Sequence, residues 1–158
     1  MDPVVRSRVL RQISYGLYIV TTSSGDQVAA GAVNWLSQVS VEPPLVVVGM
    51  ARGSGIAVLT ERAGRFAVNT LGVGQEHLAR AFFEPAVRRG DTLNGVPMRT
   101  GNDGMPILTT VPSAFECTLQ EFLSPGDHLL AVGRVTTVHE HNKLSPLLLA
   151  STGWFYGG

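Results

Sequence analysis

An arginine and a serine in a glycine-rich turn are the residues of this chain best suited to hold an anion. Residues 52–55 read Arg-Gly-Ser-Gly and directly follow a buried apolar run that begins at Leu45. The glycines let the backbone approach a ligand closely, Arg52 offers a fixed cation, and Ser54 can donate its hydroxyl while capping a helix. The pattern indicates a cradle for a phosphate. An ordinary tight turn with a surface arginine is the alternative.

Histidine is the side chain best suited to proton transfer near neutral pH, and the chain has four. His128 has the most informative context, because it follows the turn at 124–127 and precedes the apolar strand at 129–132. No direct pair with Asp127 is assumed, since neighbouring strand residues point to opposite faces. A turn histidine that only caps backbone groups is the alternative to a catalytic one.

The remaining motifs argue against other chemistries. His139 and His141 could share one strand face as metal ligands, but no third ligand is evident. We therefore prefer a solvated strand end and predict no metal site. The segment 72–77 lacks the third glycine of a dinucleotide fingerprint. A nucleophile elbow and a P-loop lysine are also missing, which argues against hydrolases and kinases.

Composition limits the class of protein. With 158 residues and 44% apolar content, the chain predicts one domain over 1–158 with a substantial core. The 12 basic and 12 acidic residues are not segregated, so no nucleic-acid partner is expected. Cys117 is the only cysteine and is interpreted as a small buried hydrophobe. No apolar run has the length of a membrane span or signal peptide, so we expect a cytoplasmic protein without a membrane partner.

The elements that must position these residues are mostly strands. Apolar periodicity and turn signals indicate six or seven strands and about three helices that do not alternate regularly, which favours a closed antiparallel barrel with peripheral helices. The first helix is expected on the outside of a sheet, and a long excursion over 84–112 is expected to hold one short strand near Ile107. We predict helices over 3–14, 56–62 and 74–83. One strand is predicted to begin at Leu45. The other strands are predicted over 15–22, 27–34, 37–41, 65–71, 113–123, 129–139 and 147–155.

Six ordered segments together carry a family resemblance that spans most of the chain. They are Tyr15 to Thr22, Asn34 to Ser40 leading into Glu42-Pro43-Pro44, Arg52 with Ser54, Phe66 to Leu71, Gln75 to Phe83, and Gly126-Asp127-His128 to Val135. In this order and spacing they resemble the flavin reductase-like family of FMN-binding split barrels. The segment with Asn34 is similar to the branch of flavoredoxins and rubredoxin-fused flavin reductases.

The resemblance implies a mostly β, six- to seven-stranded antiparallel split β-barrel that binds FMN, with FAD possible. It places Asn34, Trp35, Leu36, Ser37, Gln38 and Ser40 along the isoalloxazine and phosphate. Arg52 and Ser54 would hold the phosphate, while Asn69, Phe82 and Phe83 would approach the flavin. His128 would be the catalytic residue beside the nicotinamide of NADH or NADPH. Trp35 departs from the small polar residue common in the family, and would either stack near the ring or pack at a subunit interface.

The activity that the resemblance implies is hydride transfer from NAD(P)H to FMN or FAD, after which the reduced flavin passes electrons to an acceptor. A monooxygenase component, a rubredoxin-like protein or an iron protein would be that separate acceptor. The alternative is a non-enzymatic, flavoredoxin-like FMN electron carrier that a partner reduces. A barrel for another ligand such as haem lacks an axial ligand pattern. The family also implies a homodimer, with the terminus 154–156 reaching the partner's site.

Overall fold

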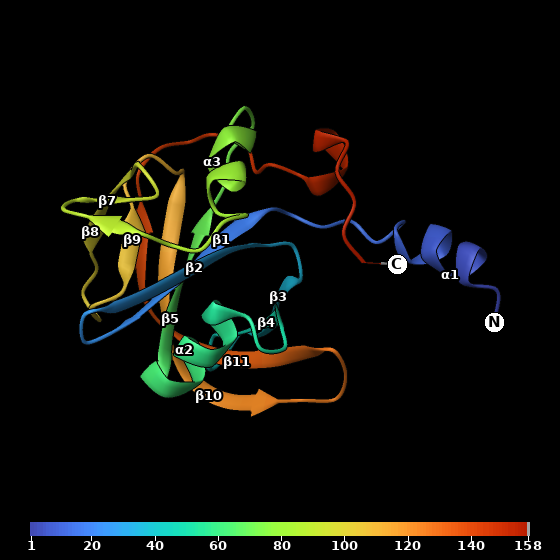
Figure 1. Ribbon diagram of the computed structural model, residues 1–158, viewed down its shortest axis with the longest axis horizontal. Helices are drawn as coiled ribbons and strands as arrows, with labels where there is room; N and C mark the ends of the chain where they lie inside the picture. The colour runs from blue at the N-terminus through green and yellow to red at the C-terminus, as the bar shows by residue number, and fades with distance from the viewer. Residues whose placement is uncertain (158) are drawn as a thin grey trace.

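The computed structural model describes residues 1–157 and is built around one seven-stranded sheet (Figure 1). All pairings are antiparallel, and the spatial order is β2-β1-β5-β10-β11-β4-β3. The sheet curls until its edge strand β2 approaches β4, so the barrel stays split there. The strands are β1 (Tyr18–Ser24), β2 (Gln27–Val33), β3 (Leu36–Ser40), β4 (Leu45–Ala51), β5 (Arg65–Thr70), β10 (Ser113–Leu123) and β11 (His128–Glu140).

The excursion over 84–112 is more ordered than the sequence predicts. It forms a second antiparallel sheet of four short strands, where one strand was expected. An Asn94-Gly95 turn at positive φ joins two of them, as such a pair commonly does in hairpins. The Asn94 side chain also accepts from Val87 N and donates to Ala81 O, both at 2.7 Å. The strands are β6 (Arg88–Arg89), β7 (Thr92–Leu93), β8 (Val96–Thr100) and β9 (Pro106–Leu108).

Three α-helices accompany the sheets, as predicted, but the first is shorter and differently placed. Helix α1 (Pro3–Leu10) has no buried residue and projects away from both sheets (Figure 1). Its apolar side chains are therefore not buried against a sheet, although the sequence predicts that they would be. Helix α2 (Gly55–Ala63) begins after the Ser54 cap and ends at Gly64 in the left-handed region, as predicted. Helix α3 (Glu76–Ala81) is shorter than the helix predicted over 74–83.

No helix within residues 1–157 combines the length and the apolar character that crossing a membrane requires.

The predicted strand over 147–155 is wrong. Here the described residues form no strand: isolated bridges pair Leu148 with Gly16 and the preceding Pro146 with Gly72, and the 3-10 helix η1 (Leu149–Thr152) follows. The hydroxyls of Ser151 and Thr152 donate to carbonyls three residues back, each at 2.7 Å. Such local bonds compete with a sheet ladder and favour a turn.

Two large apolar clusters form the core. The barrel interior packs Phe66, Val68 and Met50 around Cys117, whereas the second cluster lies between the main sheet and the small one. Burial, with the charges of Asp103 and Glu116, raises the pKa of Cys117 to about 12. The thiol is thus an inert packing group, as predicted.

Candidate functional site

A cleft of about 540 Å³ opens at the split in the barrel. One wall is the edge strand β2, in which residues 28–33 are only Val, Ala and Gly, so short side chains leave room for a ligand. Because β2 pairs with β1 alone, its outer backbone groups face away from the sheet; Ala32 N donates to Phe82 O at 3.4 Å, and the other outer groups remain available to a ligand. The end of β4, the start of α2 and residues 82–86 complete the walls, with His128 and Tyr156.

The first turn of α2 brings a positive helix end to the cleft. Ser54 and Gly55 line the cavity, and Ser54 Oγ accepts a hydrogen bond from Ala57 N at 3.3 Å. Free backbone N–H groups and the helix dipole at such an end favour an anion. The phosphate cradle of Arg52 and Ser54 stays a prediction, for which Ser54 is placed at the cleft.

Arg52 faces away from the cleft lining. Its guanidinium donates to Gly126 O at 2.5 Å and to Ser124 O at 3.3 Å, while its backbone N donates to Asp127 O at 3.0 Å. These bonds tie the turn after β4 to the loop that precedes His128. Arg52 thus holds the loop and contributes its charge near the start of α2.

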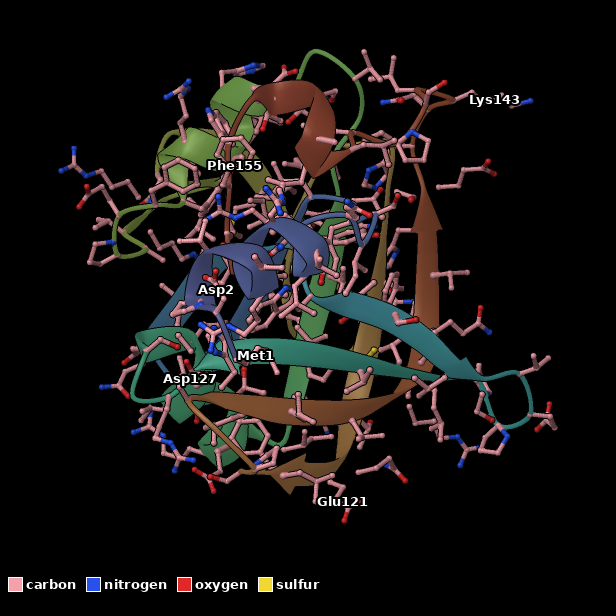
Figure 2. The ribbon with its side chains drawn as sticks, turned by 90° about the vertical axis from the view of Figure 1, so that its right-hand side faces the viewer. Met1, Asp2, Glu121, Asp127, Lys143 and Phe155 are labelled. Carbon is pink, nitrogen blue, oxygen red and sulfur yellow. The ribbon has the colours of Figure 1, made fainter. Side chains whose placement is uncertain are left out.

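His128 lies in a chain of hydrogen bonds that the sequence did not predict. Its Nδ1 is 2.8 Å from Asp127 Oδ1, and its Nε2 is 2.8 Å from the hydroxyl of Tyr156. The pair with Asp127, for which the sequence offers no ground, can form because β11 begins at His128, so Asp127 lies in the turn and strand alternation does not apply. Figure 2 shows Asp127 at this turn.

The protonation of the two partners follows from their surroundings. Hydrogen bonding to His128 lowers the pKa of the exposed Asp127 carboxyl. Partial burial, with the charge of Asp127, raises the pKa of the Tyr156 phenol. At neutral pH the carboxylate therefore accepts and the phenol keeps its proton.

Trp35 covers the imidazole. The two ring centroids are 4.4 Å apart, and the Tyr156 ring lies 5.5 Å from Trp35. A Cβ at Gly49 would meet Trp35 at 3.1 Å, so this glycine makes the close approach possible. Trp35 therefore packs on His128 of its own chain.

The C-terminal segment also lies against its own chain, where the family resemblance had placed it in a partner's site. Trp154 packs edge-on to Phe83 at 5.4 Å, and the Arg80 guanidinium lies 4.6 Å from its ring. Arg11 covers Phe155 at 5.0 Å and donates to Gly157 O at 3.2 Å. Between these contacts, Tyr156 lies against His128.

Apart from Asn69, the other predicted site residues divide into three groups. Phe82 and Phe83 line the cleft as expected. Leu36, Ser37, Gln38 and Ser40 lie on β3, at the sheet edge opposite β2, and do not line it. Asn34 is buried beside the cleft, in an adjoining cavity of about 100 Å³, and its Nδ2 has no hydrogen-bond partner.

Asn69 serves the core instead of the cleft. It is fully buried on the inner strand β5, between β1 and β10. Its amide donates to Ile19 O at 3.1 Å and to Thr21 Oγ1 at 3.2 Å, and its Oδ1 accepts from Leu108 N at 2.8 Å. It thereby joins the small sheet to the large one. The expectation that Asn69 approaches a ligand is thus corrected.

The solvated strand end predicted around His139 is wrong as well. The buried Glu116 carboxylate accepts from the backbone N of Asn102 and Asp103, and lies 2.8 Å from His139 Nε2. Because Arg99 can only donate to His139 Nδ1, the Nε2–H must donate to Glu116. This network fastens the 101–105 loop, and no trio of His, Cys, Asp or Glu within residues 1–157 gathers as a metal site.

Two features of the site were missed in the sequence. The small residues at 28–33 signal a surface that leaves space, but a strand pattern alone does not reveal which sheet edge it will occupy. Tyr156 was noted only as part of an apolar terminus. Its position depends on tail contacts with Arg11, Arg80 and Phe83, which are distant in sequence.

The fold and the cleft are those expected of this class of split barrel, and the chain belongs to the family described as flavin reductase like domain, whose model matches residues 10–157. The predicted split-barrel fold is confirmed. The solved nitrilotriacetate monooxygenase component B homologue from Mycobacterium thermoresistibile is 30% identical, with a TM-score of 0.81, over 93% of this chain and 82% of that one.

Two curated relatives support the same family. A "Probable flavin reductase" of Rhizobium meliloti is 34% identical over 155 residues, covering 98% of this chain and 49% of the relative. A "Flavin reductase" of Pseudomonas putida is 33% identical over 159 residues, covering 100% of this chain and 91% of the relative. The chain thus spans about half the length of the first relative and 21% of a diflavin flavoprotein of Nostoc.

A flavin fits the residues of this cleft. The unpaired Asn34 amide is a buried donor without a protein acceptor, and a carbonyl of a bound ring would satisfy it. The edge of β2 offers alternating donors and acceptors, and the start of α2 suits a phosphate.

Proposed function

We propose that the protein is an NAD(P)H-dependent flavin reductase. The observation that carries the proposal is the juxtaposition of a helix end at Ser54, which lines the cleft, and a buried unpaired amide at Asn34, in the cavity that adjoins it. A flavin nucleotide has a phosphate for the first and a ring carbonyl for the second. The flavin, when bound, supplies the hydride acceptor, and the protein supplies orientation and electrostatics.

Each part of the cleft then has a role. Ser54 and the first turn of α2 would bind the phosphate, while the β2 edge and Asn34 would bind the polar side of the ring. Phe82 and Phe83 would pack against the ring system, with Phe83 on the exposed side. Hydrogen-bond donors near the ring stabilise the negative charge that develops during reduction. His128 would act beside the nicotinamide.

The names of further relatives support both cofactors. One is an NADH-dependent FMN reductase of Streptomyces nodosus, and another is an NADH:FAD oxidoreductase of Streptomyces globisporus. We infer NADH as a hydride donor, and FMN or FAD as the acceptor. Other relatives are named as components of monooxygenases, which supports a separate protein as the final acceptor. A rubredoxin-like or iron protein is a further class of acceptor to test.

An electron carrier without its own hydride donor is the second candidate. The similarity to diflavin flavoproteins favours it, because there the matching segment is a fifth of a longer chain. The carrier would bind flavin in the same cleft but would receive electrons from a partner protein.

The His128→Ala variant tests the reductase site, since an electron carrier would not be reduced by NAD(P)H in either form. If His128 acts beside the nicotinamide, the variant should reduce its flavin about 10- to 1000-fold more slowly, since positioning and proton transfer are both affected. Flavin affinity should barely change, as His128 would not touch the phosphate or Asn34. Stopped-flow absorbance of the bound flavin measures the rate directly. Identical reduction by parent and variant would remove His128 from the proposed site.

A further inference from the structure

The hydrogen bonds around His128 have a definite polarity. A carboxylate can only accept, so the Asp127 contact at 2.8 Å requires the proton on Nδ1. The neutral imidazole then has a lone pair at Nε2, and the Tyr156 hydroxyl donates to it at 2.8 Å. The phenol has only one proton, so it can meet another group solely as an acceptor.

This arrangement leaves His128 without a free ring nitrogen. Asp127 uses one nitrogen and Tyr156 the other, while Trp35 covers the ring at 4.4 Å. Tyr156 lines the cleft and is half exposed, so its oxygen remains accessible. A ligand beside His128 therefore encounters the phenol oxygen.

The nicotinamide ring has one donor that matches this acceptor. Its carboxamide carries an NH2 group, whereas the rest of the ring offers no N–H. We propose that Tyr156 is a substrate-positioning residue whose oxygen accepts a hydrogen bond from the nicotinamide carboxamide, with Asp127 and His128 holding the hydroxyl. This assignment rests on the proposed reductase function and makes the role of His128 indirect.

A substrate analogue tests the contact. In reduced 3-acetylpyridine adenine dinucleotide a methyl group replaces the carboxamide NH2. We expect the parent to favour NADH over the analogue in kcat/KM, and Tyr156→Phe to reduce this preference by about 2- to 12-fold, as for one neutral hydrogen bond. The effect should fall mainly on KM. The different ring potential of the analogue cancels when the two enzymes are compared.

A control and a spectroscopic measurement make the test specific. Tyr15→Phe removes another phenol outside this hydrogen-bond chain and should keep the parent's preference. In the flavin-free protein, long-range proton–nitrogen NMR should show a protonated Nδ1 and an accepting Nε2 for His128. Tyr156→Phe should shift the Nε2 signal, and Asp127→Ala should allow the proton to move to Nε2.

Three results would overturn the proposal. The first is a proton on Nε2 in the parent, since the phenol would then donate towards the cleft. The second is an unchanged preference for NADH in an active Tyr156→Phe variant, which would reject this contact and leave the reductase function standing. The third is a parent that oxidises neither dinucleotide, which would reject the reductase function and this assignment together.

Discussion

At the scale of single residues, two buried asparagines have opposite roles. Asn69 has protein partners for both its amide and its carbonyl, whereas Asn34 has an amide without a partner. A polar group that is satisfied inside the protein stabilises the fold, and one that is left unpaired is available to a ligand. Substitution of each residue by alanine should therefore give contrasting results.

Asn34→Ala should weaken flavin binding without weakening the fold. No amide hydrogen bond within the protein is lost, so the free energy of unfolding should change by less than about 1 kcal/mol. The flavin loses one hydrogen bond, and its Kd should rise about 2- to 12-fold. Fluorescence titration with FMN measures the affinity, and an unchanged Kd would contradict the role of Asn34.

Asn69→Ala should do the reverse. The variant leaves Leu108 N without its partner in the core and removes the side-chain bond to Ile19 O, so the free energy of unfolding should fall by about 1–3 kcal/mol. Urea unfolding of the flavin-free protein gives this value. The folded fraction should bind FMN with the parent's Kd, and a loss of affinity as large as that of Asn34→Ala would return Asn69 to the site.

At the scale of elements, the turn from β4 into α2 should bind FMN, which has a phosphate, more tightly than riboflavin, which has none. Arg52→Ala removes a positive charge near the helix start and releases the loop before His128. FMN affinity should fall about tenfold, the equivalent of a 1.4 kcal/mol loss. Riboflavin has no phosphate and should bind the variant nearly as it binds the parent. Equal losses for both ligands in titration calorimetry would refute the phosphate assignment.

The elements that sequence reasoning predicted well are those with local signals. The strands predicted over 15–22 and 27–34 form the hairpin of β1 and β2, and α2 follows from the predicted cap at Ser54. The small sheet was missed because its strands are very short, although Asn94-Gly95 was a turn signal. The tail over 147–155 was misassigned because an apolar run does not specify a strand.

The site was predictable only where its residues adjoin such signals. Ser54 belongs to the cap of α2, and Phe82 and Phe83 follow α3, so their places could be anticipated. Asn69 and the β3 residues depended on which face or edge a strand would present. Tyr156 depended on contacts across most of the chain. Long-range packing, which local patterns do not encode, thus decides the rest of the site.

At the scale of the whole molecule, α1 exposes apolar side chains that the described residues do not cover. Val4, Val9 and Ile13 are more than half exposed, and no residue of α1 is buried. In Figure 2 α1 lies in front of the sheet, beside the tail that carries Phe155. Exposed apolar surface of this kind is typical of an interface. We propose a homodimer through this face. The organisation of residues 1–158 as one domain also stays a prediction.

Deletion of residues 1–12 should therefore abolish association while preserving the barrel. Light scattering at micromolar concentration should give twice the 16.8 kDa chain mass for the intact protein and one chain mass for the deletion. At a concentration where the intact protein is also monomeric, the melting temperature should shift by less than about 3 °C. A monomeric intact protein would contradict the dimer.

The central claim is that one cleft binds a flavin and lets NAD(P)H reduce it, and anaerobic spectroscopy tests this most directly. Purified protein is loaded with FMN or FAD, freed of excess flavin, and mixed without oxygen with NADH or, separately, NADPH. We predict that the yellow absorbance of the bound flavin bleaches within seconds to minutes with NADH, and far more slowly for free flavin under the same conditions. Flavin that binds but stays oxidised with both dinucleotides would contradict the reductase and favour the electron carrier.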